Sequence, residues 1–178
     1  MTNIFLESGL QLDFTAIDSF RFESLNTYKS LSGQYLKEMD FVFFDNNRVH
    51  FLEVKTYEML NAYPLTEEAL QAKMTNLKPE LAKTITDALL MMSAVWLKTE
   101  SGEKLRSDGI PPSLADYSPP ILLIAVDFPA SMKQFMGPLN DSINSALNGY
   151  ASLFAAKVLL LDYERLVSSF PFITKVGI

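Results

Sequence analysis

The sequence predicts an α/β protein in which helices flank a mixed β-sheet, and three patterns support this fold class. Aromatic and β-branched residues surround a short polar turn at Asn46 and Asn47, as in a tight β-hairpin. Apolar residues recur at helical spacing over 81–96, which is typical of a helix that packs one face on a core. Two apolar runs, 121–126 and 157–161, are separated by a helical segment, the order of a parallel crossover.

The first part of the chain predicts extra N-terminal strands. Apolar and polar residues alternate over 10–14 and again over 20–23, which is the period of a half-buried strand. Residues 30–38 are polar around one glycine and predict a loop. This loop leads into the hairpin, whose two strands we expect at 39–45 and 48–56.

The helical part of the sequence predicts two helices after the hairpin, at 66–76 and 79–98. We expect them to be separate because a proline disfavours helical geometry in the residue that precedes it, and Pro79 stands between them. Residues 99–119 are rich in Ser, Gly, Pro and charge and predict a surface loop. A further helix is predicted at 139–152, between two apolar runs that are expected to form buried strands.

Length and composition set the class of protein. We expect a single domain over 1–178, since this length buries a full core and 48% of the residues are hydrophobic. The chain contains no cysteine, which excludes disulfides, thiolate metal sites and cysteine nucleophiles. Its start has no basic leader, and no apolar run approaches the ~20 residues that a membrane span needs. A soluble, cytoplasmic protein without membrane contact is therefore expected.

The charge balance is acidic. The formal net charge is −6 and the isoelectric point is about 4.8. This counts against a general nucleic-acid binder, because non-specific affinity for DNA comes mostly from Lys and Arg that neutralise phosphates. Carboxylates that bind divalent cations would offset part of this charge.

The hairpin carries the residues with the clearest chemical potential. Glu53 and Lys55 are two residues apart on one strand and therefore point to the same face, while Val54 points to the other. Asp40 begins the partner strand, although Asp is depleted in strands. Two carboxylates from adjacent strands can bind a Mg²⁺ or Mn²⁺ ion, and a neighbouring lysine can position or deprotonate a water or place positive charge on a developing oxyanion.

Asp40, separated by twelve residues from Glu53-Val54-Lys55, resembles the motif of the PD-(D/E)XK, or restriction-endonuclease-like, nuclease superfamily. The order of hairpin, helix, buried strand, helix and buried strand over 39–162 resembles that family's common core. The resemblance implies that Asp40 and Glu53 are catalytic residues that bind magnesium, that the backbone carbonyl of Val54 is a further ligand, and that Lys55 assists the attacking water. Met39 stands where the motif often has proline.

The family's first helix often carries another acidic residue, and Glu23, with Glu7 as second choice, is the candidate here. The resemblance implies a magnesium-dependent nuclease that hydrolyses DNA phosphodiester bonds, and a homodimer if it cuts duplex DNA at specific sites. The acidic isoelectric point favours an alternative from another class. In that alternative, a non-catalytic domain of the same fold acts as a protein-interaction module.

Three other polar residues are assigned structural roles. His50 alternates with the apolar residues of its strand and faces away from Glu53, so we expect a partly buried, structural histidine. Asp127 and Asp162 each end a predicted buried strand, where sites often gather in α/β sheets. We expect both to cap loops.

Overall fold

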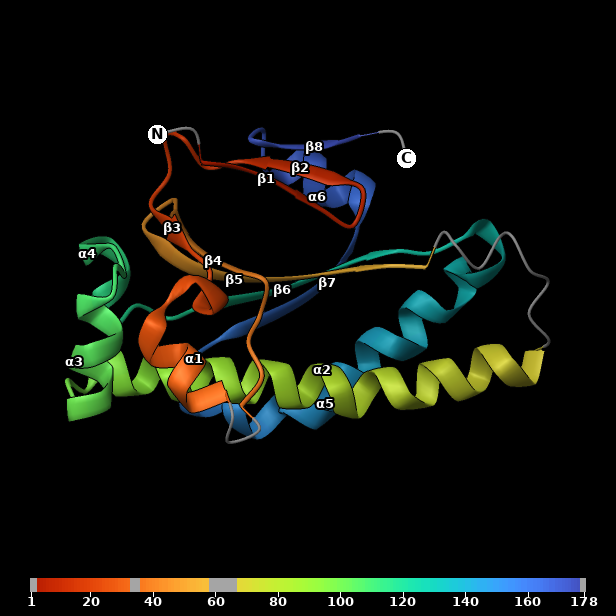
Figure 1. The fold of residues 1–178 in the computed structure, drawn as a ribbon. Helices are drawn as coiled ribbons and strands as arrows, with labels where there is room; N and C mark the ends of the chain where they lie inside the picture. The colour runs from red at the N-terminus through yellow and green to blue at the C-terminus, as the bar shows by residue number, and fades with distance from the viewer. Residues whose placement is uncertain (1–2, 33–35, 58–66, 177–178) are drawn as a thin grey trace.

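The computed structural model describes residues 3–32, 36–57 and 67–176 and shows three layers, with a five-stranded sheet in the middle (Figure 1). The central sheet has the spatial order β3 (Ser19–Phe20), β4 (Phe41–Asp45), β5 (Arg48–Thr56), β6 (Ile121–Asp127) and β7 (Lys157–Asp162). A smaller sheet has the order β1 (Ile4–Glu7), β2 (Leu10–Asp13) and β8 (Ile173–Lys175).

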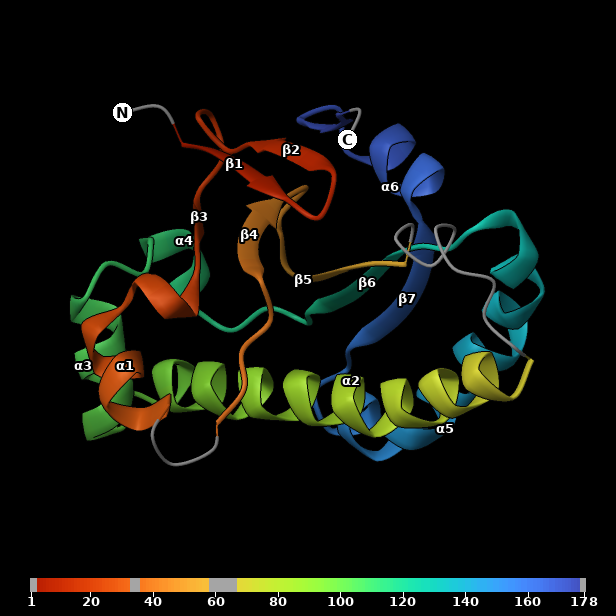
Figure 2. The same ribbon diagram turned by 45° about the vertical axis from the view of Figure 1, so that its right-hand side comes forward.

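The helices lie around these sheets. The described helical elements are η1 (Phe22–Ser24), α1 (Asn26–Ser32), α2 (Glu67–Trp96), α3 (Glu100–Ser107), α4 (Pro112–Ala115), η3 (Ala130–Phe135), α5 (Met136–Leu153) and α6 (Tyr163–Ser169). The two longest, α2 and α5, run along one face of the central sheet, and the smaller sheet and α6 lie over the other face (Figures 1 and 2).

The central sheet is mixed, which confirms the predicted α/β class with a mixed sheet and flanking helices. Pairings are antiparallel from β3 to β5 and parallel from β5 to β7. Both parallel connections contain a helix, since α2 lies between β5 and β6 and α5 between β6 and β7. The parallel strands therefore bring their carboxyl ends, the usual location of α/β sites, to the same edge.

Each face of the central sheet contributes to its own hydrophobic core, because side chains alternate along every strand. On the helical face, Phe51, Leu122 and Ile124 pack with α2 and α5. On the other face, Leu52 and Leu123 pack with β2, β8 and α6. The strand β6 is buried on both faces, as predicted, whereas β7 is the edge of the sheet and is mostly half-buried.

The predicted N-terminal strands are present, but they end earlier than expected. The alternation over 10–14 belongs to β2, whereas the second alternating segment contributes only two residues to β3 and then enters η1. The predicted loop at 30–38 begins inside α1. The alternation of apolar and polar residues near Phe22 predicted a strand wrongly, because one turn of 3-10 helix also directs the Phe22 side chain into the core.

The predicted break at Pro79 was wrong, because α2 continues through it. A proline within a helix loses one backbone hydrogen bond and usually bends the helix. Here Pro79 and its neighbours Lys78 and Glu80 lie on the exposed side, where water can compensate the carbonyl group concerned. The opposite side is buried, beginning with Leu77 and Leu81, and this packing holds the helix together across the proline.

The segment predicted as a surface loop, 99–119, contains α3 and α4 instead. Thr99 caps α3, because its side-chain oxygen accepts a hydrogen bond from the amide of Gly102 at 3.1 Å. Gly102 packs directly on the backbone of α2 at Ala94, a contact that no larger residue would permit. Tertiary packing on α2 thus stabilises a short helix whose composition favours a loop.

Candidate functional site

The hairpin that carries the motif forms as predicted, except that its first strand begins at Phe41 and not at residue 39, which leaves Asp40 outside the strand. Its strands β4 and β5 pair in antiparallel register from Phe41 opposite Leu52 to Asp45 opposite Arg48. Asn46 and Asn47 make the turn with φ values of 49° and 59°. Two successive positive φ values give a turn whose twist matches that of the strands, and asparagine tolerates this backbone better than most residues.

Asp40 lies immediately before β4, at the open end of the hairpin. Its Oδ2 accepts a hydrogen bond of 2.7 Å from the backbone amide of Val54. The last paired residues at this end of the hairpin are Phe41 and Leu52. The backbone amide of Val54 lies beyond them, and it donates its hydrogen bond to the Asp40 carboxylate instead of to a residue of β4. This contact fixes the Asp40 side chain against β5, next to Glu53.

Glu53 and Lys55 share the face of β5 that is directed at α2. The Glu53 side chain is only 4% exposed, and its Oε1 lies 2.8 Å from the Lys55 ammonium. Its Oε2 is buried and makes no hydrogen bond of good geometry among the described residues, although the backbone of Asp40 comes near enough to the carboxyl to lower its pKa. On α2, the Glu80 carboxylate lies 3.8 Å from the same ammonium. A buried carboxylate oxygen without a partner costs about 1–3 kcal/mol, which is unusual in a purely structural ion pair.

The two carboxyls at the centre of the site have raised pKa values. Burial, together with the charge of Glu7, raises the pKa of Asp40 to about 6, against the opposing effect of the Val54 amide. Burial and the nearby Asp40 charge raise the pKa of Glu53 to about 7. The two groups therefore lie close enough to repel each other, and one lysine compensates them only in part.

Lys55 keeps its positive charge in this environment. Partial burial lowers its pKa, but the charges of Glu53, Asp40 and Glu80 outweigh this effect and the net pKa is raised. An ammonium surrounded by carboxylates is a hydrogen-bond donor rather than a proton acceptor. The side chain can therefore orient a water or stabilise an oxyanion more readily than it can act as a base.

The candidates for a further acidic ligand meet at Arg21. The Arg21 guanidinium lies 3.0 Å from Glu23 and 3.3 Å from Glu7, and it covers the ring of Phe41 at 4.7 Å. Of the two carboxylates, Glu7 is the one whose charge acts on Asp40. The side chain of Glu23 is 53% exposed, and its ion pair is directed at Arg21.

The donor set fits a hard divalent cation. In the described part of the chain, no group of three or more His, Asp or Glu side chains could hold a metal ion. Two carboxylates and a backbone carbonyl can nevertheless supply three oxygens, and Mg²⁺ usually keeps several waters. The Oε2 atom of Glu53, buried without a partner, is the observation that supports this fit.

Sequence reasoning missed Glu80, which the long helix α2 brings to Lys55. No local pattern links these residues, because they are 25 positions apart and meet only when α2 crosses the sheet. The sequence pattern that could have indicated Glu80 is its place after Pro79, in a polar stretch of an otherwise apolar helix. Because a helix break was expected at Pro79, the sequence did not place Glu80 on a helix long enough to reach Lys55.

The residues assigned structural roles behave largely as expected. His50 is buried, stacks on Phe43, and contacts the carbonyl oxygen of Arg48 through Nδ1 at 3.1 Å. Burial lowers its pKa. Asp162 caps α6, since its Oδ1 accepts a 2.8 Å hydrogen bond from the amide of Arg165. Asp127 differs from the prediction, because its carboxylate is 3.0 Å from the ammonium of Lys175 on β8.

No protein-family model, curated protein or solved structure matches the chain. None of the described helices combines the length and apolar character needed to cross a bilayer.

Proposed function

We propose that this protein is a magnesium-dependent nuclease with a restriction-endonuclease-like fold, acting in the cytoplasm on DNA. The observation that carries the proposal is the convergence of Asp40, Glu53 and Lys55 at the end of one hairpin, with a buried Glu53 oxygen that lacks a partner. The order of hairpin, α2, β6, α5 and β7 supports the fold assignment.

The carboxylates and one carbonyl would hold the cation. Asp40 and Glu53 supply two anionic oxygens, and the Val54 carbonyl is directed to the same side as its amide, which binds Asp40. When bound, Mg²⁺ or Mn²⁺ stabilises the anionic transition state of phosphodiester hydrolysis and lowers the pKa of a bound water. The raised pKa values of both carboxyls indicate negative charge that a cation would compensate.

Lys55 is the side chain that provides positive charge at the site in addition to the metal ion. Its ammonium is held by Glu53 and, at longer distance, by Glu80. From this position it can donate a hydrogen bond to the attacking water or to a non-bridging phosphate oxygen. Glu80 limits the movement of the ammonium and acts as a positioning residue.

Cleavage of DNA by the purified chain tests the proposal. We expect wild-type protein to nick or degrade DNA with Mg²⁺ or Mn²⁺ and to lose this activity in EDTA. Asp40→Asn and Lys55→Ala should each reduce the rate by at least about a thousandfold, since each removes charge at the reacting phosphate. Asp45→Asn, at the opposite end of β4, is a matched control that should keep full activity.

Equal activity of the wild type and both variants would show that a contaminating nuclease is responsible. If the wild type is inactive but folded, the alternative function is favoured. In that case the domain is a non-catalytic protein-interaction module. Exposed apolar residues where α2 and α5 end, among them Leu97 and Leu153, would then be the first surface to test.

A further inference from the structure

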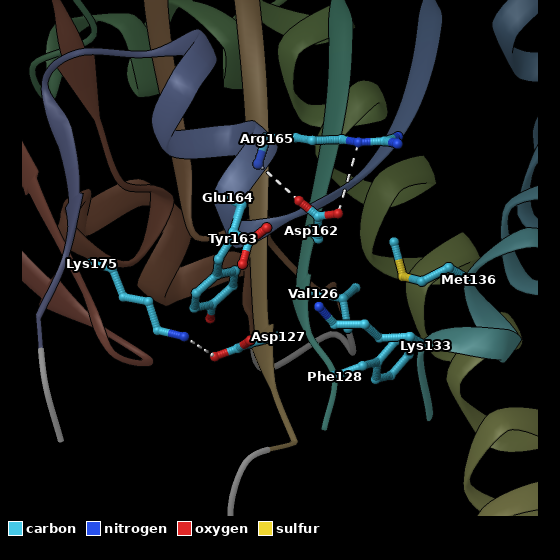
Figure 3. A pocket seen from close by; sticks show the side chains of 10 residues that line it. All are labelled: Val126, Asp127, Phe128, Lys133, Met136, Asp162, Tyr163, Glu164, Arg165 and Lys175. Carbon is cyan, nitrogen blue, oxygen red and sulfur yellow. Dashed lines mark hydrogen bonds and ion pairs between the residues drawn. The ribbon is translucent and has the colours of Figure 1, made fainter. Parts of the chain in front are cut away.

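A cavity of about 260 Å³ lies at the carboxyl ends of β6 and β7 (Figure 3). Ligands of open α/β sheets commonly bind at this edge. Two of the residues that line it, Val126 and Asp127, pair in register with Lys55 and Thr56 of β5. Because neighbouring strands are ~5 Å apart, the cavity begins one strand away from the strand that carries Glu53.

Three cations from three different elements border this cavity. They are Lys133 of η3, Arg165 of α6 and Lys175 of β8. Lys175 lies 3.0 Å from Asp127, and Arg165 lies 3.8 Å from Asp162. Within the described ranges of the chain, Lys133 takes part in no ion pair.

The side chain of Lys133 is directed into the cavity. Figure 3 shows its ammonium end turned from η3 toward Val126, and both residues line the cavity. Asp127 is engaged by Lys175, and Asp162 by the first turn of α6. Glu164, the remaining carboxylate of the lining, is exposed, and so is Lys133, so water and salt screen the charges of both, while Lys133 is the one whose ammonium is outside an ion pair among the described residues. Lys133 is thus the cation best placed to meet an anionic group.

The rest of the lining is largely apolar. Phe128 and Tyr163 are buried, and Met136 contributes a half-buried side chain. The cavity therefore combines an apolar wall with three cations and three carboxylates, which makes it more charged than the usual small-ligand site. The volume of about 260 Å³ is slightly below the usual range of such sites, which suits no more than a single nucleotide and excludes a duplex.

We propose that this cavity binds one nucleotide of the substrate strand, with its phosphate on Lys133 and its sugar and base against the apolar wall. The inference rests on the proposed function, because the nucleotide is taken to belong to the DNA strand that the nuclease cleaves. A strand whose scissile phosphate lies at Glu53 brings a neighbouring nucleotide to the ends of β6 and β7. The cavity would therefore position the strand and leave the chemistry to the hairpin.

Binding of thymidine 5′-monophosphate to the full chain in EDTA tests this inference without turnover. Isothermal titration or ligand-observed NMR should show binding of the monophosphate and at least about tenfold weaker binding of thymidine, which lacks the charged group. Lys133→Gln should weaken binding of the monophosphate by about tenfold and leave binding of thymidine unchanged. The matched control is Lys157→Gln, an exposed lysine at the opposite end of β7.

Several outcomes would overturn the inference. They are absence of binding, equal affinity for monophosphate and thymidine, and equal weakening by the Lys133 and Lys157 substitutions, which would indicate general surface attraction. The two proposals can also fail separately. Lys133-dependent binding in a chain that never cleaves DNA would support the nucleotide site and contradict the proposed nuclease activity. Metal-dependent cleavage with no effect of Lys133→Gln on binding would support the nuclease activity and contradict the nucleotide site.

Discussion

Replacing Glu53 with glutamine is expected to stabilise the metal-free protein at alkaline pH, although it weakens the contact with Lys55. The folded state buries the Glu53 carboxyl beside Asp40, and both effects raise its pKa from an ordinary value of 4.5 to about 7. The folded protein therefore binds more protons than the unfolded protein within this window. Its stability falls as pH rises from about 4.5 to about 7 and is constant above that.

The size of the effect follows from the width of this window. At about 1.4 kcal/mol for each pH unit, a single isolated group would cost at most ~3 kcal/mol at pH 8. Asp40 shares the interaction, and glutamine makes a weaker contact with Lys55, so we expect a gain of about 2 kcal/mol for Glu53→Gln. Below about pH 4.5 the carboxyl is protonated in both states, and the two proteins should be equally stable.

Thermal or urea denaturation in EDTA at about pH 8 and about pH 4.5 measures this difference. For a chain of this size, ~2 kcal/mol corresponds to an increase in Tm of roughly 4–8 °C. Excess Mg²⁺ should stabilise the wild type and have little effect on Glu53→Gln, because it binds only the folded site. A variant that is less stable than the wild type at both pH values would refute the reasoning and show that Glu53 is a structural partner of Lys55.

Three further substitutions test the packing and the site. Gly102→Ala should destabilise the protein by at least about 3 kcal/mol in urea denaturation, because the added Cβ would lie 1.9 Å from a backbone oxygen of α2. Gly137→Ala is the control and should not destabilise the protein, because a Cβ at this position meets nothing within 4 Å. Asn47→Gly should raise stability by about 0.5 kcal/mol, since glycine adopts the positive φ of 59° without strain; a decrease in the denaturation midpoint would contradict this. Glu80→Gln should change stability by less than about 0.5 kcal/mol and cleavage by less than tenfold, because its ion pair with Lys55 is long and half-exposed; complete loss of cleavage would instead make Glu80 a ligand.

Local sequence determined the hairpin and its chemistry. The side chains of Glu53 and Lys55 share a face because strand periodicity is fixed by the backbone, and Asn46 and Asn47 make the turn because they tolerate a left-handed conformation. The crossover of α5 between two parallel strands also followed from the alternation of apolar runs and a helical segment. The hairpin depends on interactions between residues close in sequence, and the crossover follows from the preferred way in which consecutive parallel strands are connected, so pattern alone was sufficient for both.

Only the tertiary structure decided the continuity of α2 across Pro79 and the presence of Glu80 beside Lys55. It also placed the carboxylate of Asp40 on the amide of Val54 and the side chain of Lys133 at the ends of β6 and β7. The physical reason is the same in each case. Burial of one helix face outweighs the cost of a proline, and contacts between residues distant in sequence depend on how whole elements pack, which no local pattern specifies.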